Sequence, residues 1–145
     1  MTAGKINQRV ITQRVTWVRQ MLASLQDLPL ESRDSFLKEK HTVAAAESYL
    51  RRALEALFDL GRHILVKKFA YPATEYKAIA VGLAEKNIIQ GADAEVMRRM
   101  AGYRNRMVHF YQEITPEDLY EICALHQKDI EKLVQILATW AKSHQ

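Results

Sequence analysis

Several side chains that suit chemistry on phosphate lie close together in one stretch of the sequence. Four arginines fall between positions 98 and 106 with no acidic residue among them: Arg98, Arg99, Arg104 and Arg106. One guanidinium group can bind two phosphate oxygens at once, and it can stabilise the negative charge of a transition state. His109 follows, and an imidazole can move a proton near neutral pH. RNA carries its own nucleophile, the 2′-hydroxyl, so its cleavage needs only a base, an acid and an anion stabiliser, and this set of residue types suits phosphodiester chemistry of that kind.

Helical spacing places these side chains on two stripes, since a helix advances about 100° per residue. Arg104 shares the first stripe with apolar residues, namely Met97, Met100, Ala101 and Val108. An arginine on an apolar stripe is costly unless something pairs with it, so a purely structural, ion-paired Arg104 is the alternative. The second stripe collects Arg98, Gly102, Asn105 and His109. Asn105 and His109 can touch there, and Gly102 allows another backbone to approach. Taken alone, a histidine on a helix is more often structural than catalytic, and it is the neighbouring amide and guanidinium groups that favour a catalytic His109.

Five amphipathic helices are expected to position this segment, because apolar residues recur at steps of three and four. The first expected helix covers 5–26, and the second starts between 32 and 35 and ends at 67. The other three cover 74–90, 94–109 and 116–140. Thr74, Asp93 and Thr115 are expected N-caps, and Gln90-Gly91 is expected to close the third helix. Short loops favour antiparallel neighbours, so the sequence predicts an all-α, up-and-down bundle with no sheet.

Length and composition set further limits. The chain has 145 residues, of which 48% are hydrophobic, and this predicts a single domain over 1–145. A formal charge of +4 permits a nucleic-acid partner without requiring one. Cys123 is the single cysteine, which excludes an internal disulfide and favours a reducing cytosol. No apolar run is long enough to span a membrane. We expect a cytoplasmic protein with no cofactor and no metal site.

The segment from Arg104 to Tyr111 resembles the R-x4-H-x-Y motif of HepT-like toxins, a ribonuclease family of the HEPN superfamily. Asn105 matches the polar residue that follows the arginine, and residues 100–103 and 113–116 resemble the usual context. The resemblance implies a HEPN-like homodimer in which two motifs face one cleft, and a metal-independent endoribonuclease. It also implies a nucleotidyltransferase antitoxin that transfers AMP to Tyr111.

These expectations assign specific roles. Arg104, His109 and Asn105 are the expected catalytic residues, and Arg98, Arg99 and Arg106 are possible contacts to RNA phosphate. Tyr111 is the expected AMP acceptor, although it could instead close the helix and pack on Leu119. Trp17 and Trp140 are expected in the core or at a dimer seam rather than stacked on bases.

Two other functions remain open at this point. The chain could be a non-catalytic HEPN-like module that holds RNA or a nucleotidyltransferase, or a purely structural dimeric bundle. An intact set of Arg104, His109 and Tyr111 favours the enzyme, because neither alternative needs it.

Overall fold

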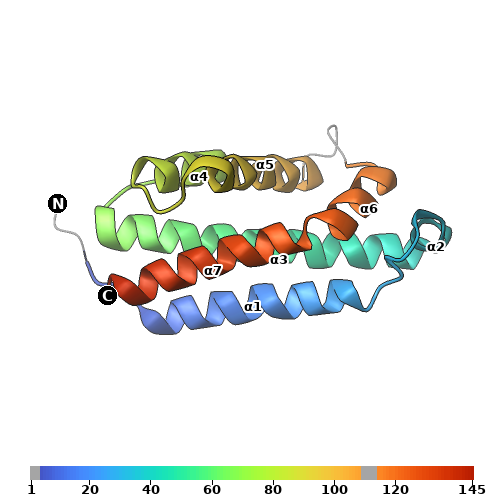
Figure 1. Ribbon diagram of the computed structural model, residues 1–145, viewed down its shortest axis with the longest axis horizontal. Helices are drawn as coiled ribbons and strands as arrows, with labels where there is room; N and C mark the ends of the chain where they lie inside the picture. Colours follow the sequence, from blue (N-terminus) through green and yellow to red (C-terminus); the bar gives the residue numbers. More distant parts are fainter. Residues whose placement is uncertain (1–3, 109–113) are drawn as a thin grey trace.

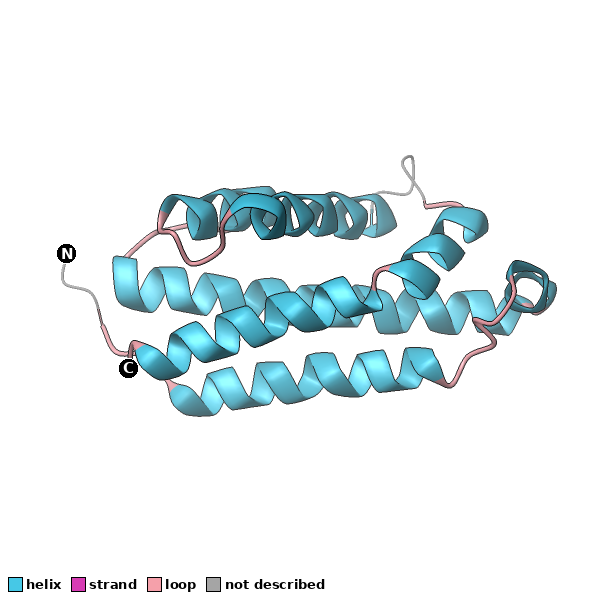
Figure 2. Cartoon of the chain, in the orientation of Figure 1, coloured by secondary structure: helices cyan, strands magenta, loops and turns pink. Residues whose placement is uncertain are grey.

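The computed structural model describes residues 4–108 and 114–145, and within these ranges the chain forms helices and no strands (Figures 1 and 2). The described helices are α1 (Gln8–Gln26), α2 (Arg33–Lys38), α3 (Lys40–Phe69), α4 (Tyr76–Glu85), α5 (Gly91–Val108), α6 (Pro116–Leu125) and α7 (Gln127–Ser143). The predicted all-α class is confirmed. The described helices number seven rather than five.

The longest helix, α3, forms the centre of the bundle and contacts each of the other six helices. Figure 1 shows α1 and α5 on opposite sides of α3, with α7 running beside α1 and α3. Chain direction alternates through α1, α3, α5 and α7, which confirms the predicted up-and-down arrangement. All seven helices contribute buried apolar side chains to the core.

The start of α1 is set by a side-chain cap. The Asn7 carboxamide accepts hydrogen bonds from the backbone N–H groups of Arg9 and Val10, at 3.0 and 3.3 Å. These are two of the donors that the first turn of a helix leaves without a partner. The helix therefore begins at Gln8 rather than at Lys5, and it ends at Gln26 as predicted.

The predicted second helix is wrong in one respect, because it divides at Glu39. This residue is extended, with φ −117° and ψ 113°, and its carboxylate accepts from the His41 N–H. Glu39 is thus the C-cap of α2 and the N-cap of α3. The break lets α2 turn and bury Phe36.

The predicted end of the third helix at Gln90-Gly91 is also wrong. Helix α4 ends at Glu85, and Asn87 takes a left-handed conformation with φ 58°. The Ile88 N–H then bonds to the Leu83 carbonyl at 3.0 Å, and the Asn87 N–H to the Ala84 carbonyl at 3.0 Å. This is the Schellman pattern, with asparagine in the position that glycine usually takes.

The start of α5 also differs from the prediction. Gly91 opens α5 with φ +54°, so the helix begins before the expected cap. Asp93 lies in its first turn and pairs with Lys132 at 3.1 Å. Thr74 likewise does not cap α4, because the N-cap residue is Glu75.

The last predicted helix starts as expected and then divides. The Thr115 hydroxyl accepts from the Asp118 N–H at 3.1 Å, and Pro116 is the first residue of α6. The helix breaks at His126, whose Nδ1 lies 2.8 Å from an Asp129 carboxylate oxygen. Cys123 is fully buried, and burial raises the pKa of its thiol to about 12.

None of the helices in the described ranges combines the length and the hydropathy needed to cross a bilayer.

Trp17 is 42% exposed, so the expectation of a core position is wrong for this residue. Trp140 is partly buried and packs against Phe69, with ring centroids 5.7 Å apart.

Candidate active site

Helix α5 carries the arginine-rich segment and packs against α3, α4 and α7. Met97, Met100 and Ala101 are fully buried on its inner face, as the first stripe predicts, whereas Val108 of the same stripe is 44% exposed. Arg104 lies one turn further on, where its side chain is 23% exposed. The packing of the methionines therefore directs the Arg104 side chain towards α3.

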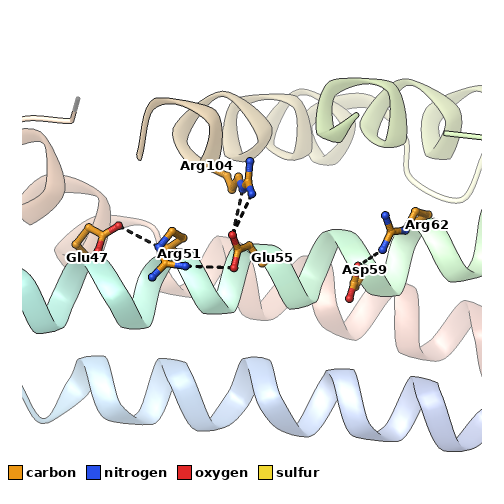
Figure 3. Close-up of polar contacts among 6 residues, drawn as sticks. All are labelled: Glu47, Arg51, Glu55, Asp59, Arg62 and Arg104. Atoms are coloured by element: carbon orange, nitrogen blue, oxygen red, sulfur yellow. Dashed lines mark hydrogen bonds and ion pairs between the residues drawn. The ribbon is translucent and has the colours of Figure 1, made fainter. Parts of the chain in front are cut away.

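Glu55 of α3 is the partner that Arg104 needs (Figure 3). Arg104 donates from Nε and Nη2 to the same carboxylate oxygen, Oε2, at 3.3 and 3.1 Å. The guanidinium also lies over the Tyr76 ring of α4, 4.2 Å from the ring centroid. Burial raises the pKa of Tyr76; Arg104 opposes this shift, while Glu55 adds to it. A phenol with a raised pKa stays neutral, and the electron-rich face of its ring attracts a cation such as the Arg104 guanidinium.

The geometry of these contacts determines which part of Arg104 can act on a ligand. A guanidinium has five N–H donors in a fixed planar fork. Glu55 occupies the side formed by Nε and Nη2. Among the described residues, no hydrogen-bond partner is found for Nη1, so the outer side formed by Nη1 and Nη2 can bind two oxygens of a phosphate.

Glu55 is held in turn by a row of charges along α3. Its other oxygen, Oε1, accepts from Arg51 Nη1 at 3.4 Å, and Arg51 Nε donates to Glu47 at 3.2 Å. Figure 3 shows this row leading from Glu47 through Arg51 and Glu55 to Arg104. The four alternating charges sum to zero, with Arg104 as the cation that compensates the second carboxylate of the row.

The other predicted site residues are placed differently. Arg106 pairs with Asp118 of α6 at 3.1 Å, and Arg98 pairs with Glu95 at 3.3 Å within α5. Arg99 is exposed and Asn105 is half-buried. A Cβ added at Gly102 would meet nothing within 4 Å, so the surface there is open.

His109 and Tyr111 lie outside the described residues, so the expected contact between Asn105 and His109 is not tested. Arg104 and Asn105 come from consecutive positions on α5, about 100° apart around the helix. The assignment of Arg98, Arg99 and Arg106 to RNA phosphate also stays a prediction.

Glu55 and Tyr76 are the residues that sequence reasoning missed. The apolar stripe indicated that Arg104 needs a partner, but Glu55 is 49 positions away. The spacing of Glu47, Arg51 and Glu55 at four-residue steps was a readable signal for ion pairs along one helix face. Nothing local indicated which helix this face would meet.

A family model described as ribonuclease HepT-like matches residues 18–137. This range includes α5 and the whole Arg104–Tyr111 segment. The chain belongs to the HepT-like ribonuclease family. The expected resemblance is thereby confirmed.

Individual relatives agree with the HepT-like assignment. A protein from Shewanella oneidensis described as mRNA nuclease HepT is 27% identical over 89 residues, which are 61% of this chain and 66% of that protein. The aligned part therefore spans slightly less than two thirds of the relative's length.

Two solved structures share the HepT-like fold. A tri-AMPylated HEPN toxin from Shewanella oneidensis, in complex with MNT antitoxin, has a TM-score of 0.81 at 20% identity and covers 90% of this chain and 97% of its own. A toxin–antitoxin structure with AMP-PNP has a TM-score of 0.77 at 20% identity, covering 88% and 97%.

Proposed function

We propose that this HepT-like chain is the toxin of a toxin–antitoxin pair and cleaves RNA without a metal ion. One observation carries the proposal. Arg104 is held by Glu55 and Tyr76 so that the outer side of its guanidinium is left for a phosphate. A structural arginine would need only the ion pair. The ordered row of charges behind Glu55 also suits a group whose orientation matters.

The chemistry follows from the groups available. The RNA 2′-hydroxyl loses its proton and attacks the adjacent phosphorus, the bond to the 5′-oxygen breaks, and that oxygen gains a proton. The product is a 2′,3′-cyclic phosphate. His109 moves the protons, Arg104 stabilises the charge on the phosphorane-like transition state, and Asn105 orients His109 or the phosphate.

Two copies of the motif are proposed to meet in a homodimer. One arginine and one histidine make a sparse site, and the open surface at Gly102 permits a second chain to approach α5. The two-fold arrangement would supply a second set of Arg104 and His109 to one cleft.

Control by an antitoxin is proposed at Tyr111, on the precedent of the tri-AMPylated relative bound to its antitoxin. The antitoxin is expected to be a nucleotidyltransferase. The phenolic oxygen of Tyr111 would attack the α-phosphorus of ATP, and pyrophosphate would leave. The bound AMP would place a negative phosphate near the α5 arginines and fill the cleft, so RNA would be excluded. Co-expression with the nucleotidyltransferase, followed by intact-mass measurement, should show whole AMP units that map to Tyr111. An unmodified but neutralised toxin would contradict this mode of control.

The activity is tested by cleavage of RNA in EDTA. The wild-type chain should release fragments ending in a 2′,3′-cyclic phosphate or its hydrolysis product. Arg104→Ala and His109→Ala should each lower the rate about a hundredfold or more. Arg33→Gln, which removes an exposed arginine on α2, is the matched control and should leave the rate unchanged. Loss of activity in EDTA, or full activity of His109→Ala, would refute the mechanism. RNA binding without any cleavage would favour the non-catalytic module.

A further inference from the structure

A small hollow lies between α1 and α3, beside the Glu55 side chain that holds Arg104. Its volume is about 260 Å³, and its lining residues are Arg14, Trp17, Arg52, Glu55, Ala56 and Asp59. Glu55 belongs both to this lining and to the contact with Arg104. Figure 3 shows Glu55 on α3, with α5 and Arg104 on one side of it and α1 on the other. The hollow and the proposed catalytic arginine are thus separated by a single side chain.

Trp17 gives this hollow an aromatic surface. Trp17 is 42% exposed. Within residues 4–108 and 114–145, it is the one aromatic residue among the large hydrophobic residues that are exposed. An exposed indole face can stack on an unpaired nucleobase, and such stacking accepts every base. The hollow is smaller than the roughly 300–1,000 Å³ of pockets that enclose a whole small molecule. It suits one base at the surface rather than an enclosed nucleotide cofactor.

The charges around the hollow favour a polyanion. The charged residues of the hollow and the ion pairs that continue from them comprise five arginines and three carboxylates: Arg14, Arg51, Arg52, Arg62 and Arg104, and Glu47, Glu55 and Asp59. Asp59 pairs with both Arg14 and Arg62, so its charge is already compensated. Arg52 is exposed, and among the described residues no carboxylate lies within salt-bridge distance of it. The excess positive charge therefore lies beside Trp17.

We infer that this hollow is a subsite for single-stranded RNA, in which a base next to the cleaved bond stacks on Trp17 and Arg52 binds a backbone phosphate. The inference rests on the proposed ribonuclease function. It adds that the substrate is unpaired next to the cleaved bond, because a base held in a duplex cannot stack on a protein side chain. Tryptophan and arginine are also enriched at protein interfaces, so contact with a second copy of this chain is an outcome that the test separates from RNA binding.

The test uses the full chain carrying His109→Ala, so that RNA is bound but not cut. The probe is a fluorescein-labelled oligouridylate, and its affinity is measured by anisotropy over a series of salt concentrations. Trp17→Ala should weaken binding about 5- to 150-fold, the range for stacking one base on an aromatic residue. Trp17→Phe should recover most of the affinity. A probe without bases should bind the parent and the Trp17→Ala variant with equal affinity.

Arg52→Gln tests the phosphate contact. It should reduce the slope of log affinity against log salt by about 0.7, the value for one contact to a single strand. Arg33→Gln removes the same charge from α2, remote from the hollow, and should leave the slope unchanged. Equal slopes for the two variants would overturn the role of Arg52.

The outcomes separate this inference from the function on which it rests. If the chain with His109 intact cleaves RNA while Trp17→Ala binds the probe as well as its parent, the subsite is refuted and the ribonuclease stands. If Trp17→Ala converts a dimer to a monomer in light scattering, Trp17 is a dimer contact and the subsite is also refuted. A chain that neither binds nor cleaves RNA refutes both. Because Trp17 lies outside the core, the helical circular dichroism of Trp17→Ala should match that of the parent.

Discussion

Replacement of Glu55 by glutamine tests whether the ion pair with Arg104 orients the arginine for catalysis. The change keeps the shape of the side chain but removes its charge, so Arg104 and Arg51 lose the carboxylate between them. At 3.1 Å and an effective dielectric constant of about 20, the gross attraction of two unit charges is on the order of 5 kcal/mol. Desolvation offsets most of this. Hydrogen bonds to charged groups contribute about 1.5–3 kcal/mol, exposed ion pairs about 0–1 kcal/mol, and these two side chains are 23% and 31% exposed. We therefore expect Glu55→Gln to lower the free energy of unfolding by about 1–2 kcal/mol.

The effect on catalysis should follow from lost orientation. Arg104 remains present and charged, but its guanidinium is free to rotate away from the phosphate. A loss of about 1.4 kcal/mol in transition-state stabilisation corresponds to a tenfold fall in kcat. We expect a fall of about this size with little change in KM, measured on an RNA substrate at a temperature where the variant is fully folded.

Glu47→Gln is the matched control, because Glu47 pairs with Arg51 but not with Arg104. It should cost less than about 0.5 kcal/mol in urea unfolding and leave kcat within about twofold. Equal losses of kcat in Glu47→Gln and Glu55→Gln would refute the orientation argument. A rise in kcat for Glu55→Gln would show that Glu55 restrains Arg104 instead.

Two further predictions concern stability, both measured by urea unfolding. Gly82→Ala should destabilise the protein by about 1–3 kcal/mol, because the new Cβ would lie 2.7 Å from the Tyr71 ring and 3.0 Å from buried Leu65; an unchanged midpoint would show that the Tyr71 ring moves aside at no cost. His63 accepts a hydrogen bond from the Asn7 N–H through Nε2, and burial, helped by Lys67 and Arg14, holds the pKa of His63 below its usual value. The unfolded chain binds a proton on this histidine more readily than the folded chain does. The stability that neutral His63 contributes to the fold is therefore complete above about pH 6.5, and it is lost as the pH falls through the folded pKa. His63→Gln should flatten the stability profile in that window, and an unaltered profile would assign the acid sensitivity to other groups.

Some features of the fold were readable from the sequence because their causes are local. Thr115 followed by proline and two acids specifies a helix start through contacts within one turn. The breaks at Glu39 and His126 were not predicted, because each lies in a short polar stretch, 38–42 and 126–129, that could equally belong to an exposed turn of a continuous helix. They depend on where Phe36 and the two halves of the last helical segment find space in the core. Pro116 at the start of α6 is a strong local signal for a helix start. Asn87, which follows the end of α4, is a weaker signal, because asparagine takes this position less often than glycine does.

The candidate site divides in the same way. The position of Arg104 on an apolar stripe correctly indicated a paired arginine. The identity of its partners required α3 and α4 to be placed beside α5, which no local pattern encodes. The roles of His109 and Tyr111 stay predictions based on residue type and on family membership.

The position of Glu55 along α3 has a consequence for how the site responds to thermal motion. Glu55 lies 15 residues from the first residue of the helix and 14 from the last, about four turns from either end. Helix ends fray, whereas amides in the middle of a packed helix exchange their hydrogens only when large parts of the fold open. We therefore expect the amides around Glu55, the anchor for Arg104, to be among the slowest to exchange. Partial opening of α2 or α6 would leave the Glu55 carboxylate in place, so such openings could come and go without disassembling this side of the site.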